Sequence, residues 1–152
     1  MFPLTGTLLT GTEARKWMQI GCSQLDDEAF FCSGFLKTDA LRSFARFLRS
    51  GSRVKILVRW RLDDILSKAS DLDAYLFAKE QGWNFFMDMD FHGKVFFFPA
   101  KGIILGSANL TSAGFSLSEK HNLEVCTQVH DTPENRNFLG RLFKNSTQVT
   151  DM

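Results

Sequence analysis

Two hydrophobic periods alternate along this chain, and each period predicts a different kind of element. Residues 29–35 (AFFCSGF) and 54–60 (VKILVRW) are short apolar runs that are typical of buried strands. Between them, residues 38–49 carry apolar side chains at helical spacing and arginines on the opposite side, which predicts an amphipathic helix. Gly51 is suited to the left-handed position that ends such a helix. This part of the chain is therefore predicted to be strand, helix and strand.

The alternation continues to the end of the chain. Residues 63–81 are predicted to form one helix, or two with a break at Ser70, and Gly82 ends this segment. The residues expected to face inward from it are Leu72, Tyr75, Leu76 and Ala78. A last helix is predicted from Pro133, and its expected apolar stripe is Phe138, Leu139, Leu142 and Phe143.

The most apolar strands lie near the middle of the sequence. VFFF (95–98) and IIL (103–105) have no polar position, so both faces of these strands should be covered. Further strands are expected at 85–89 and 123–129. Strands that alternate with helices predict an α/β protein, a layered α/β/α sandwich with a mixed, partly parallel sheet.

The length and composition fit one densely packed domain. A chain of 152 residues with 16 phenylalanines can bury a substantial core, so a single domain over 1–152 is expected. Within it, residues 28–146 are expected to form the core, 1–27 an N-terminal extension with a short helix at 13–20, and 147–152 a tail.

Cellular location is predicted from what the sequence does not contain. The apolar segments are shorter than a membrane span, and the first residues lack the basic start of a signal peptide. Cys22, Cys32 and Cys126 are widely spaced and form no CxxC pair, which indicates reduced thiols. We therefore expect a cytoplasmic protein that does not associate with a membrane.

The net charge of +1 exerts no overall attraction on nucleic acid, but the basic residues are unevenly distributed. Between Asp39 and Asp63 there are seven basic residues and no acidic one: Arg42, Arg46, Arg49, Arg53, Lys55, Arg59 and Arg61. Such a surface can attract a polyanion, although ordinary solvated arginines would look the same. Candidate nucleic-acid contacts are Arg42, Arg46, Arg59 and Arg61. The last two are preferred because they follow a probable strand at its carboxyl end, where α/β sheets place ligands.

The candidate chemistry lies between residues 91 and 109 (FHGKVFFFPAKGIILGSAN). His92 and Lys94 are two residues apart and would project from one side of a strand. Ser107 and Asn109 repeat this spacing after the second apolar run. A lysine with neutral donors suits phosphate oxygens, and imidazole can act as a nucleophile or carry a proton. The alternative is a buried hairpin that carries polar residues without a function.

These motifs together resemble the phospholipase D superfamily. The family pattern is His-x-Lys, four residues, Asp, and then Gly-Ser-x-Asn; the matching residues here are His92, Lys94, Gly106, Ser107 and Asn109. Glu124 stands where many members place a carboxylate that supports the histidine. Pro99 occupies the Asp position, which is a departure from the pattern. The likeness covers about residues 30–129 and is strongest to single-motif, nuclease-like members, including domains attached to restriction systems.

The resemblance implies a phospholipase D-like domain and a metal-independent phosphodiesterase without a cofactor, with DNA as the expected substrate. His92 would form a phosphohistidine, and Lys94 would hold the phosphate oxygens together with Ser107 and Asn109. Glu124 would orient His92. Because the chain has one His-x-Lys motif, the resemblance implies a homodimer with a composite site. Restriction or helicase-type subunits are candidate further partners.

Two other functions remain open at this stage. The loss of the motif Asp at Pro99 is compatible with a catalytically silent module for nucleic-acid binding or assembly. A phospholipid headgroup hydrolase would use the same chemistry. If the missing aspartate is structural in relatives, activity can survive its replacement; if it is essential, this chain is inactive.

Overall fold

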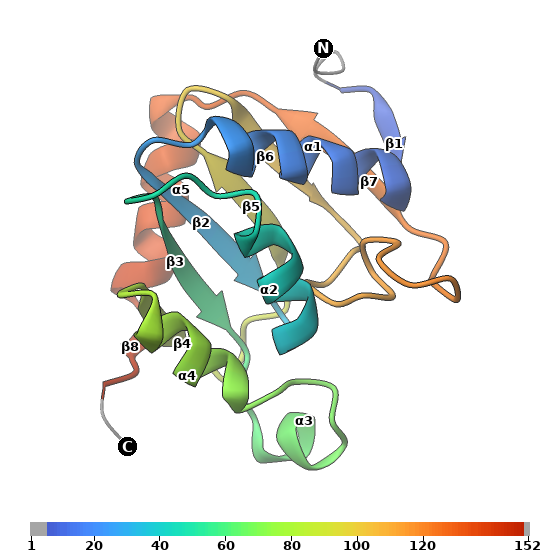
Figure 1. Cartoon of the computed structure of the whole chain (residues 1–152). Coiled ribbons are helices and arrows are strands. Elements are labelled where there is room, and N and C mark those ends of the chain that lie inside the picture. The colour runs from blue at the N-terminus through green and yellow to red at the C-terminus, as the bar shows by residue number, and fades with distance from the viewer. Residues whose placement is uncertain (1–5, 151–152) are drawn as a thin grey trace.

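One mixed β-sheet forms the middle layer of the computed structural model, which describes residues 6–150 (Figure 1). Its strands are β1 (Leu8–Thr10), β2 (Glu28–Ser33), β3 (Arg53–Val58), β4 (Asn84–Met87), β5 (Lys94–Phe98), β6 (Gly102–Gly106), β7 (Val125–Val129) and β8 (Thr147–Gln148). The strand order is β1-β7-β6-β5-β2-β3-β4-β8. β3 runs parallel to β2 and to β4, and the other neighbouring pairs are antiparallel. The predicted mixed, partly parallel sheet is confirmed.

Helices lie on both faces of this sheet. They are α1 (Gly11–Gln24), α2 (Thr38–Ala45), α3 (Leu62–Leu66), α4 (Asp73–Glu80) and α5 (Pro133–Lys144). α1, α2 and α4 share one face, and α5 lies on the opposite face (Figure 1). Phe96 packs into the core of the three-helix side, whereas Phe97 packs toward Leu139 of α5. The expectation that the apolar central strands are covered on both faces is confirmed for residues 96–98, 103 and 104, whereas Leu105 at the end of β6 is 37% exposed.

Both ends of the described chain take part in the domain. Residues 8–24, which the sequence assigned to an N-terminal extension, form β1 and α1. β1 pairs with β7, and α1 buries Trp17 and Met18 in the main core. Thr10 caps α1 through a reciprocal pair of hydrogen bonds with Glu13, which satisfies free backbone donors at the helix start. Part of the predicted tail forms β8, which pairs with β4.

Two predicted helical segments can be compared directly with the structure. α2 ends at Ala45, earlier than expected, whereas residues 63–81 follow the second of the two predicted alternatives, two helices with a break around Ser70. The break occurs where the buried Ser70 hydroxyl accepts a hydrogen bond from Leu36 N at 3.1 Å. This contact holds the segment between α3 and α4 against the loop after β2.

Three side chains that were expected to face inward are exposed instead. Leu72 and Leu76 are 49% and 55% exposed, because α4 turns Tyr75 and Ala78 toward the core. Phe138 is 56% exposed, since α5 buries Leu139 and Phe143. No helix within residues 6–150 is both long enough and apolar enough to cross a membrane.

Strand direction brings the motif segments to one end of the sheet. β5 runs antiparallel to both β2 and β6. The amino end of β5 therefore lies beside the carboxyl ends of β2 and β6. Residues 92–94, 106–109 and 33–35 meet at this end.

Candidate active site

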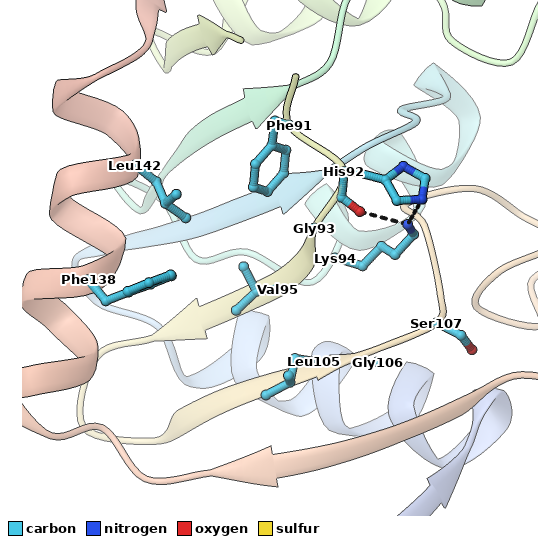
Figure 2. Close-up of a pocket in the computed structure, with 10 residues that line it drawn as sticks. All are labelled: Phe91, His92, Gly93, Lys94, Val95, Leu105, Gly106, Ser107, Phe138 and Leu142. Atoms are coloured by element: carbon cyan, nitrogen blue, oxygen red, sulfur yellow. Dashed lines mark hydrogen bonds between the residues drawn. The ribbon is translucent and has the colours of Figure 1, made fainter. Parts of the chain in front are cut away.

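His92 and Lys94 lie together where β5 begins. Lys94 Nζ donates a hydrogen bond to the carbonyl oxygen of His92 at 2.8 Å and lies 3.4 Å from Nε2 of the same residue (Figure 2). His92 is exposed and Lys94 is half-buried. His92 belongs to the loop before β5, so the two side chains meet through this loop and not through strand alternation. The imidazole is accessible, while the ammonium group is held beside it.

The electrostatic surroundings of Lys94 favour an anion. Burial lowers the pKa of Lys94, the positive charge of Arg59 lowers it further, and Glu124 opposes both effects. Two cations that repel each other in a partly buried site are stabilised when a negative group binds between them. A phosphate group is an anion of this kind.

Ser107 and Glu124 form the neighbouring part of the site. Ser107 Oγ donates to Glu124 Oε1 at 2.7 Å and accepts from Val125 N at 3.0 Å. Asn122 Nδ2 donates to the other carboxylate oxygen of Glu124 at 3.4 Å. The carboxylate expected to orient His92 is thus engaged by Ser107 and Asn122 in this chain, and no hydrogen bond joins it to His92 within the described residues. Glu124 orients the serine hydroxyl.

Asn109 is held from the side of β2. Its Oδ1 accepts a hydrogen bond from Phe35 N at 3.0 Å. A Cβ placed on Gly34 would lie 3.4 Å from Asn109 Oδ1 and 3.7 Å from His92 Nδ1. Asn109 and His92 therefore approach the same glycine. Residues 33–35 were not among the expected site residues; the small pair Ser33 and Gly34 at the end of an apolar strand was the available signal.

A cavity of about 520 Å³ opens beside these groups (Figure 2). His92, Lys94 and Ser107 line its polar part, and the apolar part of the wall comes from Phe91, Val95, Leu105, Phe138 and Leu142. The volume is sufficient for a phosphate group together with part of its substituents. The arrangement can hold a phosphodiester against an imidazole nitrogen.

The candidate arginines have different surroundings. Arg59 forms a two-point ion pair with Asp64, at 3.0 and 2.8 Å, and its guanidinium lies 5.0 Å from the centre of the Phe35 ring. Arg42 lies over the Phe77 ring at 4.5 Å.

Three of the candidates are accessible to an external phosphate. Arg42 and Arg46 are exposed, and the Arg61 side chain is 43% exposed, although it donates to Met89 O at 2.6 Å and lies 3.6 Å from Asp90 Oδ1. Arg59, at 15% exposure, is the candidate that is shielded from nucleic acid.

Pro99, which replaces the motif aspartate, lies far from His92 and Lys94. It follows β5 at the hairpin to β6, one residue beyond Phe98, and the four steps of β5 alone span about 13 Å. Asp131 Oδ2 accepts a hydrogen bond from Ala100 N at 3.1 Å in this hairpin, and Arg136 holds the same carboxylate. The replacement therefore removes no side chain from the cavity.

The side chains around the cavity do not form a metal site. Within residues 6–150, no group of three or more His, Cys, Asp or Glu side chains is arranged to hold a metal ion. The polar groups around the cavity offer one imidazole and one carboxylate, a donor set that is too small for a structural or catalytic zinc site.

Comparisons with known proteins agree with this geometry. Residues 14–144 match the family model described as "Cardiolipin synthase, PLD-like domain", where PLD stands for phospholipase D. The solved structure of NucT from Helicobacter pylori superposes with a TM-score of 0.73 at 15% identity, covering 94% of this chain and 98% of NucT.

Two further solved structures are similar. Nuc from Salmonella typhimurium, described as a phospholipase D family member, gives a TM-score of 0.68 at 16% identity, with 95% of this chain and 99% of Nuc covered. TrmBL2, an archaeal chromatin protein, gives 0.61 at 13% identity and covers 94% of this chain and 53% of TrmBL2. No curated protein sequence gives a significant match.

Proposed function

Because this chain belongs to the phospholipase D superfamily, we propose that it is a metal-independent phosphodiesterase whose nucleophile is His92. One observation carries the proposal. An exposed imidazole and a lysine ammonium lie 3.4 Å apart at the mouth of a cavity that also contains Ser107. A phosphorus atom bonded to His92 Nε2 would place its oxygens within reach of Lys94.

The proposed reaction proceeds in two displacements. His92 Nε2 attacks phosphorus, an N–P bond forms, and the P–O bond to the leaving group breaks as that oxygen takes a proton from the His92 of a second copy of the chain. Water then attacks the phosphohistidine and gives its proton to this second His92, and the N–P electron pair returns to the imidazole of the first. Lys94, Ser107 and Asn109 stabilise the negative charge on the oxygens, which is greatest when phosphorus has five ligands.

DNA is the proposed substrate, and the proposed activity is that of a DNA endonuclease. Arg42 and Arg46 are exposed and the Arg61 side chain is 43% exposed, so these cations can contact a phosphate backbone. One similar structure, TrmBL2, is described as an archaeal chromatin protein that shows a novel mode of DNA binding. Restriction or helicase-type subunits are the proposed further partners, and they would contribute to the recognition of a DNA sequence.

A composite site in a homodimer is part of the proposal. One chain provides one His-x-Lys motif, and a two-fold symmetric pair would place a second His92 as the acid opposite the nucleophile. The sheet face opposite α1 supports this arrangement, because Leu8, Leu105 and Val125 are 73%, 37% and 54% exposed there. That face lies next to Ser107 and Glu124.

A second candidate function is hydrolysis of a phospholipid headgroup. The apolar wall of the cavity favours it, since Val95, Leu105 and Phe138 continue directly from the polar end. Turnover of double- and single-stranded DNA, measured beside turnover of phospholipid in mixed micelles, separates the two. DNA binding without turnover of either substrate would identify a silent binding module.

The nucleophile is tested with His92→Ala in excess EDTA, with His130→Ala as the matched control because His130 is also an exposed histidine. Wild type and His130→Ala are expected to hydrolyse a phosphodiester equally well with the chelator present. His92→Ala should lose nearly all turnover and keep its fold. Activity that returned only with a divalent ion would overturn the proposal.

The composite site is tested with mixed dimers in which one subunit carries His92→Ala. If both histidines act on one phosphorus, a single mutant copy removes nearly all turnover. Half of the wild-type turnover would show that the two sites work independently.

A further inference from the structure

The carboxyl end of β2 contacts both segments that carry the candidate chemistry. Gly34 N donates to Gly93 O at 3.0 Å, between His92 and Lys94. Ser33 Oγ accepts a hydrogen bond from Leu110 N at 2.8 Å. Residues 33–35, which we call the β2 brace, thus bridge the His-x-Lys segment and the Gly-Ser-x-Asn segment.

The hydroxyl group of Ser33 is the centre of this bridge. It donates to Phe35 O at 2.5 Å, accepts from Leu110 N, and lies 3.4 Å from Asn109 Oδ1. Ser33 is 2% exposed and Leu110 is fully buried, so water cannot take the place of the hydroxyl. Removal of the hydroxyl would leave the Leu110 N–H without a partner, and the chain would have to move to satisfy it.

Phe35 connects the hydroxyl group of Ser33 to the side-chain amide of Asn109. The carbonyl of Phe35 is held by Ser33, and its N–H is bonded to Asn109 Oδ1 at 3.0 Å. With the oxygen of the amide fixed by Phe35 N, the NH₂ group is the part of the Asn109 side chain that is left to donate to a ligand. No hydrogen bond within residues 6–150 engages that NH₂ group.

The brace also has support from outside the cavity. The Arg59 guanidinium lies over the Phe35 ring, and Asp64 holds the guanidinium at two points. Arg59 is 15% exposed and Asp64 7%, so this ion pair is shielded from solvent. Arg59, which the sequence favoured as a DNA contact, is therefore placed to restrain Phe35 instead.

We propose that Ser33 is a positioning residue, which acts through Phe35 and Leu110 to keep Asn109 aligned with His92 and Lys94. This inference rests on the proposed function only for its kinetic consequence; the structural consequence stands by itself. A displacement of about 1 Å at such a site lowers turnover on the order of 100-fold. The alignment of Asn109 with His92 and Lys94 matters more for stabilising the transition state than for binding the substrate, so kcat should change more than KM.

The test compares Ser33→Ala with Ser52→Ala. The Ser52 hydroxyl also donates to a backbone carbonyl, Leu25 O at 2.7 Å, but it lies before β3 at the opposite end of the sheet. Turnover of bis(p-nitrophenyl) phosphate is measured, together with the side-chain NH₂ resonances of Asn109 in the ¹H–¹⁵N spectrum. Ser33→Ala should lower kcat about 10- to 100-fold with a smaller change in KM. Ser52→Ala should leave kcat within about two-fold.

A double substitution shows whether Ser33 acts through Asn109. In the Asn109→Ala background, Ser33→Ala should have little further effect on kcat, because coupled residues are not additive. An equal fall in both backgrounds would overturn the inference, as would equal kcat losses in Ser33→Ala and Ser52→Ala. If Ser33→Ala does not fold, Ser33→Cys keeps the shape, weakens both hydrogen bonds and is judged by the same criteria.

The spectrum separates failure of this inference from failure of the proposed function. If wild type hydrolyses no phosphodiester, the function is refuted, yet a shift of the Asn109 NH₂ resonances in Ser33→Ala and not in Ser52→Ala still supports the brace. If those resonances do not move in Ser33→Ala, the brace is refuted whatever the activity.

Discussion

A methyl group added at Gly106 tests whether the close approach of β6 and β7 sets the position of Ser107. Gly106 pairs with Cys126, and a Cβ at this glycine would lie 2.2 Å from Val125 O and 2.6 Å from Cys126 Cα. Carbon atoms in normal contact are about 3.5–4.0 Å apart. Both obstructing atoms belong to the backbone, so Gly106→Ala requires the two strands to separate by about 1 Å.

The size of the effect follows from this displacement. Overpacking of this kind costs about 1–3 kcal/mol. For a chain of this length, a cost of about 2 kcal/mol lowers the midpoint of thermal unfolding by about 4–8 °C. Ser107 follows directly and is bonded to Val125 on β7, so its hydroxyl moves with the strands. Turnover should fall on the order of 100-fold.

Gly140→Ala is the matched control, because a Cβ at Gly140 in α5 would meet no atom within 4 Å. This change removes the flexibility of a helical glycine and should stabilise the protein by about 0.5–1 kcal/mol. Thermal unfolding followed by circular dichroism and turnover of bis(p-nitrophenyl) phosphate are measured on both variants. If Gly106→Ala matches Gly140→Ala in midpoint and in turnover, the approach of β6 and β7 does not position the site.

Three further predictions concern charged side chains. The hydrogen bonds from Arg59 hold the pKa of Asp64 below its ordinary value, so this ion pair stabilises the fold above about pH 4 and its contribution disappears as the pH falls through the lowered pKa. Asp64→Asn should therefore lower the free energy of unfolding in urea by about 3–5 kcal/mol at pH 7 and by much less in acid. A difference between wild type and variant that does not change with pH would contradict this. The Lys55 ammonium lies 4.6–5.5 Å from the centres of three phenylalanine rings, so Lys55→Met should lower the thermal midpoint relative to wild type and Lys55→Glu should lower it further; a Lys55→Met midpoint equal to that of wild type would exclude the cation–π contribution. Arg61→Ala should reduce the slope of log affinity for DNA against log salt by about 0.9 for each phosphate that Arg61 neutralises, whereas an unchanged slope would assign Arg61 to surface solvation.

Local pattern was sufficient to predict most helices and strands. The strand at 29–35, the helix from Thr38 and the helix from Pro133 were recognisable because side-chain periodicity is a property of consecutive residues. The adjacency of His92 and Lys94 is local as well, since only one residue separates them. The family likeness could be recognised for the same reason, because its motifs are short.

Burial within the helices was predicted less well. Leu72 and Leu76 are as apolar as the residues that α4 buries, and only the rotation of the helix on the sheet exposes them. Likewise, residues 8–24 carry no signal that would assign them to the core, because β1 joins the sheet by pairing with β7, more than a hundred residues later in the sequence. Their place depends on a partner that local pattern does not specify.

The arrangement around the cavity was decided by the tertiary structure alone. Ser33 and Asn109 are 76 residues apart in sequence and meet because β5 lies between β2 and β6 in the sheet. Glu124 bonds Ser107 rather than His92 because β7 pairs with β6. Strand periodicity states which side chains share a face, but it contains no information about which strands are neighbours. That information resides in the packing of the whole chain, since the strand order that buries the most apolar surface depends on every element together.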